Sequence, residues 1–342
     1  MKLFSNLWAS VAMLLMLSLA TSCENSSEQP NTPTEPEYVT VSLGVNFVDL
    51  DVTYEPLSRA QENNDVYGIQ VYSAVPTSGE YDWQPFAYGV FDSTDNLTID
   101  LLKGYEYKFV ATMVKDGKEK LVMEDRWENG EYVGKYFYCP FDSFISDNFT
   151  YGPEDHWALQ YGTSNLPYID GYSAMVDHFN SERYYGELEG YAPVDNGGKA
   201  KIQLKRTSFG AKYIAKGKNT TNGTLEILMD SAPQLNLNLA ESNQCSEIYT
   251  FYNLRDAWLE GNYSETISVL IRLVREDGSV VPFGTHNITF KRNATTVVNI
   301  NTDSSGESSG VGVEIVDGGE MPVGDEITIK DGEIVDTEIE AN

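Results

Sequence analysis

The sequence predicts an all-β protein with two sandwich-like domains in tandem. Three observations carry this prediction: apolar and polar residues alternate with a period of two through many short segments, turn residues separate these segments, and no long segment has the 3.6-residue period of a helix. We expect the domains at 38–200 and 201–302, after leading segments at 1–22 and 23–37 and before a C-terminal tail at 303–342.

The first 23 residues have the pattern of a secretory signal with an acylation site. Lys2 is the only charge, an apolar run covers 11–20, and Thr21 and Ser22 precede Cys23. Cys23 stands where a bacterial lipoprotein carries its acyl chains, so we predict a lipid anchor there. The alternatives are an ordinary cleaved signal and a transmembrane anchor, although the apolar run is shorter than the about 20 residues that cross a bilayer.

The first domain is expected to begin with a half-buried strand. Every second residue is apolar from Val39 to Phe47, and the phase then shifts by one residue over 48–54, which indicates a β-bulge or a corner. The dipeptide Asp116-Gly117 predicts a hairpin with its return strand at 121–123. The other strands expected in this domain lie at 66–72, 97–101 and 105–113.

The region 126–195 is irregular and rich in aromatic residues, which indicates packed loops or an insertion with one short helix at 175–179. Alternation resumes in the second domain, where we also expect a short helix at 252–259 and a turn at 276–278. The strands expected in this domain lie at 202–206, 211–215, 225–229, 235–239, 267–274, 288–291 and 296–300.

Polar segments flank the two domains. The stretch 24–37 has no aliphatic or aromatic residue, so it is expected to be a solvated tether, and 302–310 is expected to be a flexible linker. Beyond that linker, 311–316 and 326–329 have strand patterns. Such strands must pair with an edge of their own sheet or with another molecule.

Charge and cysteine content restrict the partners and the covalent structure. The formal net charge of −29 argues against nucleic acid, which is bound mainly through lysine and arginine, and against docking on anionic lipid. The two cysteines beyond the signal, Cys139 and Cys245, either form a disulfide or remain as free thiols. A disulfide requires Cα atoms within about 7 Å, which a sequence does not give.

The motifs of common enzymes and metal sites are missing. His156, His178 and His286 have no metal-ligand spacing, and the chain has no nucleophile elbow or phosphate loop. The acidic pairs at 49/51 and 92/95 lack the glycine and the bidentate glutamate of a calcium loop. We therefore expect no cofactor, no metal and no enzymatic activity, with a hydrolase built on two carboxylates as a remote alternative.

Aromatic residues provide a second functional hypothesis. Trp83, Trp127, Trp157 and Trp258 could form a stacking platform for sugars, together with several tyrosines. The alternative function is therefore a surface lipoprotein that binds glycans for nutrient capture.

The order of the parts resembles the FimA-type, fimbrillin-like lipoproteins of Bacteroidales. The resemblance includes Cys23, the tether, the first strand and a loop with Leu57-Ser58-Arg59-Ala60 before strand 65–72. It also includes Arg206-Thr207-Ser208-Phe209-Gly210-Ala211-Lys212 and a closing strand that begins Lys291-Arg292-Asn293, although Thr296 and Val297 stand where an aromatic residue is common.

The resemblance implies a pilus subunit or adhesin with two transthyretin-like Greek-key β-sandwich domains, lipidated and carried to the outer membrane, with other fimbrial subunits as partners. In polymerising members an arginine-specific protease cuts an early loop, the first strand leaves, and a strand from a neighbouring subunit fills the groove. Cleavage between Arg59 and Ala60 would remove 23–59, and 311–342 would then supply the donor strand. Alternatively, Arg59 is an ordinary loop residue and the tail pairs with its own domain.

Overall fold

The protein is described by a computed structural model, in which nearly all regular structure is β-strand. Among the described residues, the exceptions are helices α1 (Gly117–Lys120) and α2 (Leu254–Leu259) and the 3-10 turn η1 (Trp157–Gln160). The all-β prediction is therefore confirmed. The chain divides into Met1–Pro36 and Glu37–Asn342, and every element below belongs to the second unit. The residues that the structure describes are 36–47, 64–76, 81–166, 174–194, 198–217, 222–303 and 313–321.

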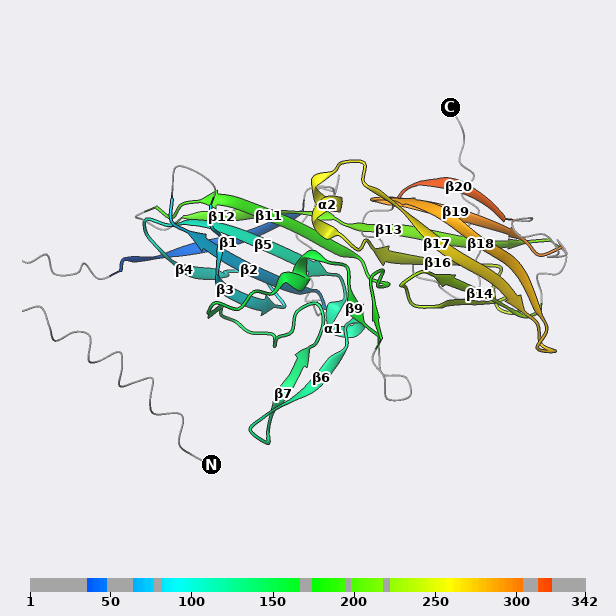
Figure 1. The fold of residues 1–342 in the computed structure, drawn as a ribbon, viewed down its shortest axis with the longest axis horizontal. Coiled ribbons are helices and arrows are strands. Elements are labelled where there is room, and N and C mark those ends of the chain that lie inside the picture. The colour runs from blue at the N-terminus through cyan, green and yellow to red at the C-terminus, as the bar shows by residue number, and fades with distance from the viewer. Residues whose placement is uncertain are drawn as a thin grey trace, which may run out of the picture. The chain divides into compact units, whose positions relative to one another are not determined.

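Eight strands of the first sandwich form one sheet in the order β4-β1-β12-β11-β5-β2-β3-β8 (Figure 1). Apolar side chains from both halves of this sheet share one core, in which Val41, Ile69 and Phe109 are completely buried. The two end strands approach each other, because the Asp100 amide in β4 donates a hydrogen bond to Tyr151 Oη in β8 over 3.0 Å. The strands are β1 (Tyr38–Phe47), β2 (Val66–Ala74), β3 (Gln84–Phe91), β4 (Thr98–Leu102), β5 (Glu106–Val114), β8 (Thr150–Tyr151), β11 (Arg183–Tyr191) and β12 (Lys199–Arg206).

The second sandwich packs two four-stranded sheets, with the orders β16-β13-β19-β20 and β15-β14-β17-β18. Their facing side chains, among them Phe209, Ile271 and Phe290, form a separate core. The predicted turn between β17 and β18 is confirmed, since Val274 pairs with Val280 across it. The strands are β13 (Ser208–Lys216), β14 (Thr224–Met229), β15 (Leu235–Asn238), β16 (Gln244–Thr250), β17 (Ser264–Val274), β18 (Val280–Lys291), β19 (Ala294–Asn301) and β20 (Val313–Glu320).

Strand pairing moves the expected boundary between the domains from residue 200 to Thr207. β12 pairs with β1 and β11, so all of it belongs to the first sandwich. A buried ion pair marks the change of sandwich: Arg206 Nη2 lies 2.7 Å from Glu182 Oε1, and Arg206 Nη1 donates to Asn293 Oδ1 over 2.7 Å. Breaking such a pair would leave a buried charge uncompensated, so it holds the neighbouring backbones in place.

Two local predictions in the first domain are wrong. The residues after β5 form α1, with Asp116 in the left-handed region at φ 55°, and no return strand pairs with β5 there. Instead, β6 (Met123–Glu128) pairs with β7 (Glu131–Phe137) in a hairpin that extends away from the sheet in Figure 1. The expected helix at 175–179 is replaced by β10 (Met175–Val176), which pairs with β9 (Ser164–Asn165).

The helix expected at 252–259 is confirmed as α2. Its N-cap is Asn253, whose side-chain oxygen accepts the amide hydrogen of Asp256 over 3.1 Å. Such a cap satisfies one of the free amides of the first turn. No helix in the described ranges is long and apolar enough to cross a membrane.

Candidate functional site

The first strand, β1, buries alternate side chains in the core of the first sandwich. Val39, Val41 and Leu43 are 7% exposed or less, whereas Thr40 and Ser42 between them are exposed. Successive side chains of a strand point to opposite faces, which explains the alternation. Burying each of these three apolar side chains contributes about 1.5–3 kcal/mol, or roughly 5–9 kcal/mol together.

β1 connects two strands that do not otherwise pair. Its first half, Tyr38 to Ser42, pairs antiparallel with β4, and its second half, Ser42 to Phe47, pairs parallel with β12. Among the described strands, β1 is the only one that pairs with β4 in the sheet, and β4 lies at the end of that sheet. Removing β1 would therefore leave β4 without a neighbour and would expose the edge of β12.

Backbone hydrogen bonds hold β1 along its length. The Leu43 amide donates to Leu97 O over 2.8 Å, and the Ser42 amide donates to Gly198 O over 3.0 Å. On the solvent face, Thr40 Oγ1 donates to Asp100 Oδ1 over 2.6 Å. Exposed polar contacts of this kind contribute little to stability. The backbone hydrogen bonds and the buried apolar side chains therefore contribute most of the free energy that keeps β1 in the sheet.

The groove that β1 occupies has apolar sides. The residues that line it come from β4 and β12, which flank β1 in the sheet, and all are at most 2% exposed with β1 in place. Without β1 these side chains would meet water beside two unpaired strand edges, which is a template for another strand. The lining residues are Ile99, Leu101, Ala200, Ile202 and Leu204.

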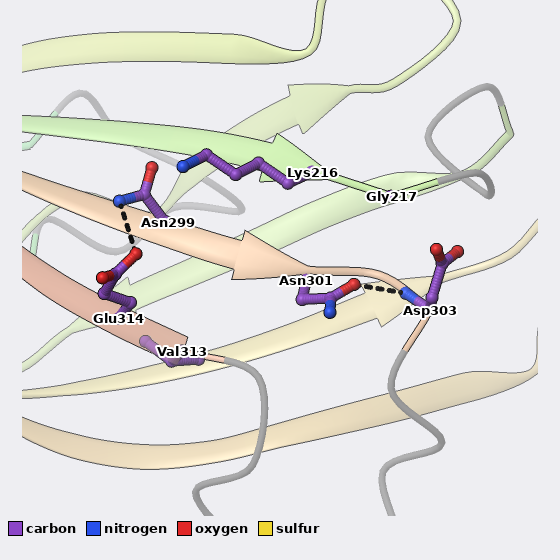
Figure 2. A pocket seen from close by; sticks show the side chains of 7 residues that line it. All are labelled: Lys216, Gly217, Asn299, Asn301, Asp303, Val313 and Glu314. Atoms are coloured by element: carbon purple, nitrogen blue, oxygen red, sulfur yellow. Dashed lines mark hydrogen bonds between the residues drawn. The ribbon is translucent and has the colours of Figure 1, made fainter.

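At the other end of the described chain, β20 pairs antiparallel with β19 but buries little of itself. Ile315 and Val316 are each 42% exposed. Figure 2 shows its first residues beside a cleft, where Asn299 Nδ2 donates to Glu314 Oε2 over 3.3 Å. This part of the tail therefore pairs with its own domain and extends the second sandwich beyond residue 302.

Three of the residues singled out by the sequence, Cys23, Arg59 and Ala60, lie outside the described residues. The strand expected at 326–329 also lies outside them, as does the phase shift at 48–54. In the sequence, Arg59 lies in the connection between the end of β1 and the start of β2.

Cys139 and Cys245 are free, partly buried thiols in the structure. Cys139 follows β7 and donates a hydrogen bond to Thr163 O over 3.3 Å, whereas Cys245 lies in β16 of the second sandwich. Burial raises the thiol pKa of each to about 11, because the thiolate would lose its hydration.

The four tryptophans proposed as a sugar platform each contact a different tyrosine. Trp83 stacks on Tyr81, and no ring contact joins two tryptophans in the described part of the chain. His156 stacks on Tyr88 with ring centroids 3.5 Å apart, and burial lowers the pKa of His156.

Asp92 belongs to one of the two acidic pairs that were compared with a calcium loop. Its side chain contacts Lys118 Nζ at 2.8 Å.

Neither a protein-family model nor a curated protein matches the chain. Solved structures that are similar include a proposed cell adhesion protein from Bacteroides eggerthii, with 12% identity, a TM-score of 0.36 and coverage of 85% of this chain and 98% of that one. The fimbrial anchor protein Mfa2 from Porphyromonas gingivalis is 8% identical, with a TM-score of 0.36 and coverage of 82% and 100%. The tip fimbrial protein Mfa3 from the same organism is 10% identical, with a TM-score of 0.32 and coverage of 75% and 94%.

Proposed function

We propose that the chain is a cell-surface subunit that assembles with other subunits by β-strand addition. The single observation that carries this proposal is the position of β1, which joins β4 to β12 and covers an apolar groove. In strand addition, backbone hydrogen bonds give affinity and the pockets for alternate side chains give specificity. The groove under β1 offers both.

Cleavage in the connection after β1 would turn a covalent part of the sandwich into an exchangeable one. After cleavage between Arg59 and Ala60, β1 would be held only by its hydrogen bonds and by the burial of three apolar side chains. Acylated Cys23 lies on the same fragment, so the lipid would anchor the precursor in the outer membrane and stay with β1.

The tail carries a sequence that matches β1. Val311, Val313 and Ile315 have the same spacing as Val39, Val41 and Leu43, with small or polar residues between them. On β20 the side chain of Ile315 remains 42% exposed, so its burial in the groove of another copy would add apolar contacts that its own domain does not provide.

The experiment is to treat the purified protein with an arginine-specific protease and follow its N-terminus and its mass in solution. We expect a new N-terminus at Ala60, loss of the β1 fragment and growth of oligomers visible by electron microscopy. The Arg59→Lys variant should resist cleavage and stay monomeric. A processed chain that begins at Ala60 yet stays monomeric at high concentration would contradict the proposal.

The donor is tested separately. Ile315→Asp should leave cleavage intact and block oligomers, because a carboxylate would have to enter the apolar groove. The matched control is Asp317→Asn on the same strand, whose side chain is exposed and contacts Lys291 Nζ at 2.9 Å. Equal assembly by the two variants would exclude β20 as the donor.

A further inference from the structure

A polar pocket of about 440 Å³ lies between the segment that follows β10 and the strands β17 and β18. Three carboxylates line it, from Asp177, Asp230 and Glu265, together with the ring of His178. Tyr252 forms part of the rim. None of these residues belongs to the groove of β1.

Lysine and arginine side chains in the described part of the chain do not balance the three carboxylates. Asp177 Oδ1 accepts a hydrogen bond from Thr163 Oγ1 over 3.0 Å, and within the described ranges no lysine or arginine pairs with Asp177, Asp230 or Glu265. Glu265 Oε2 is completely buried and has no hydrogen-bond partner there. A buried carboxylate oxygen without a donor is costly, so the site favours a ligand that brings donors.

The ring of His178 strengthens this conclusion. It is 5% exposed, and its Nδ1 lies 3.2 Å from Thr250 O, which can only accept, so Nδ1 carries the hydrogen. In the neutral ring, Nε2 is then an acceptor, and it lies 3.6 Å from Glu265 Oε1, beyond hydrogen-bond distance. Two acceptors at this distance repel each other unless a hydrogen-bond donor reaches both of them. Protonation of the ring would balance only one of the three carboxylates.

The backbone around the pocket is fixed before any ligand arrives. Ser231 O accepts hydrogen bonds from the amides of Asp177 and His178, each over 2.9 Å, while Ser231 itself has φ 51°. The Asp230 amide donates to Ser268 O over 2.8 Å. A non-glycine residue in the left-handed region costs free energy, and these hydrogen bonds hold the turn in that conformation.

An aromatic strip continues from the rim of the pocket. The ring of Tyr252 lies 5.2 Å from that of Tyr161, which lies 5.7 Å from that of Trp157. Trp157 is 62% exposed and Tyr252 is 42% exposed. The strip can pack against the apolar body of a ligand whose charged end enters the pocket.

We propose that this pocket binds a primary ammonium group carried on a compact body with an apolar face, as in a lysine side chain or an amino sugar. An ammonium has three donors and no acceptor, which matches a site of carboxylates and a bare ring nitrogen. Within the described ranges, no group of three or more histidine, cysteine or acidic residues has an arrangement that could hold a metal ion. This inference does not depend on assembly by strand addition.

The test measures the binding of two amines to the intact protein by calorimetry at low salt. The probes are D-glucosamine and Nα-acetyl-lysine N-methylamide, with D-glucose and Nα-acetyl-norleucine N-methylamide as neutral analogues. We expect at least one amine to bind with a 1:1 ratio and at least tenfold more tightly than its neutral analogue. The amine that binds more tightly identifies the source of the ligand. The proposal is overturned if neither amine binds or if the neutral analogues bind equally well.

Variants assign the binding to the pocket. Glu265→Gln should weaken the binding of the amine at least tenfold. Asp230 is exposed, so Asp230→Asn should weaken the binding several-fold without affecting the fold. The matched control is Glu314→Gln, which removes the same charge at the separate cleft of Figure 2 and should leave binding within twofold. Equal loss in the Glu265 and Glu314 variants would indicate general electrostatic attraction and would overturn the proposal.

Discussion

The contribution of β1 to the first sandwich can be measured by truncating one of its buried side chains. Leu43 is 4% exposed and pairs with Ala200 across the groove. Leu43→Ala removes the equivalent of three methylene groups, or about 2.4 kcal/mol at about 0.8 kcal/mol each, and the cavity adds to this loss. We expect the free energy of unfolding to fall by about 2–5 kcal/mol, measured by urea denaturation of the uncleaved protein.

The neighbouring residue supplies the control. The side chain of Ser42 is exposed although its backbone pairs on both sides, so Ser42→Ala should change the free energy of unfolding by about 0.5 kcal/mol or less. A loss below about 0.5 kcal/mol for Leu43→Ala, or equal losses for the two variants, would refute the placement of β1 in the core. After cleavage, the same weakening should make the β1 fragment of Leu43→Ala leave faster.

Two further outcomes test other parts of the structure. A Cβ at Gly162 would meet Phe251 O at 2.1 Å, whereas one at Gly152 would meet nothing within 4 Å, so Gly162→Ala should lower the melting temperature markedly and Gly152→Ala should not. Cys139 and Cys245 should react slowly with iodoacetamide at pH 8 and faster as the pH rises toward 11, because their raised pKa keeps both thiols protonated. Mass spectrometry counts the alkylated thiols, and failure of both to react even after unfolding would indicate a disulfide.

The alternation of apolar and polar residues in the sequence predicted the strands that bury only one of their two faces. β1 and β12 both alternate between buried and exposed residues, and the sequence indicated both. β3 has a run of consecutive buried residues, because Phe91 and Ala87 pack in the main core while Tyr88 and Val90 pack in a second one. A strand buried on both faces has no period of two, so alternation does not reveal it. β2 is also buried on both faces, yet a strand was expected at 66–72.

Turn chemistry was a weaker guide than alternation. Asp116 and Gly117 have the residue types of a tight hairpin, yet the Leu121 amide donates to Gly117 O over 3.0 Å and closes a helical turn. Turn residues give the local conformation, but the choice of partner strand depends on contacts far along the chain. β5 pairs with β2 and β11 instead of with the segment that follows it.

The candidate site was predicted in part. The sequence indicated that β1 is an amphipathic strand and that the segment with Arg59 follows it, but its neighbours β4 and β12 are distant in the chain and only the pairing identifies them. The ammonium pocket was missed altogether. Asp177 and His178 fell in an expected helix, and nothing in the local sequence places them beside Glu265.

The groove also constrains how strand exchange would be driven. A donor with valine, valine and isoleucine in the positions of Val39, Val41 and Leu43 buries nearly the same apolar surface as β1, so the gross gain of roughly 5–9 kcal/mol is similar for both strands. Exchange within the groove is then close to balanced, and the donor also loses its pairing with β19, so the direction of exchange must come from elsewhere. Dilution of the released fragment, or its retention at the membrane through a lipid on Cys23, would lower the concentration of β1 near the groove. Each subunit that arrives would bring its own donor strand and so keep the concentration of donor strands near the groove high. A lipid on Cys23 would thus favour assembly by holding β1 away from the subunit that it leaves.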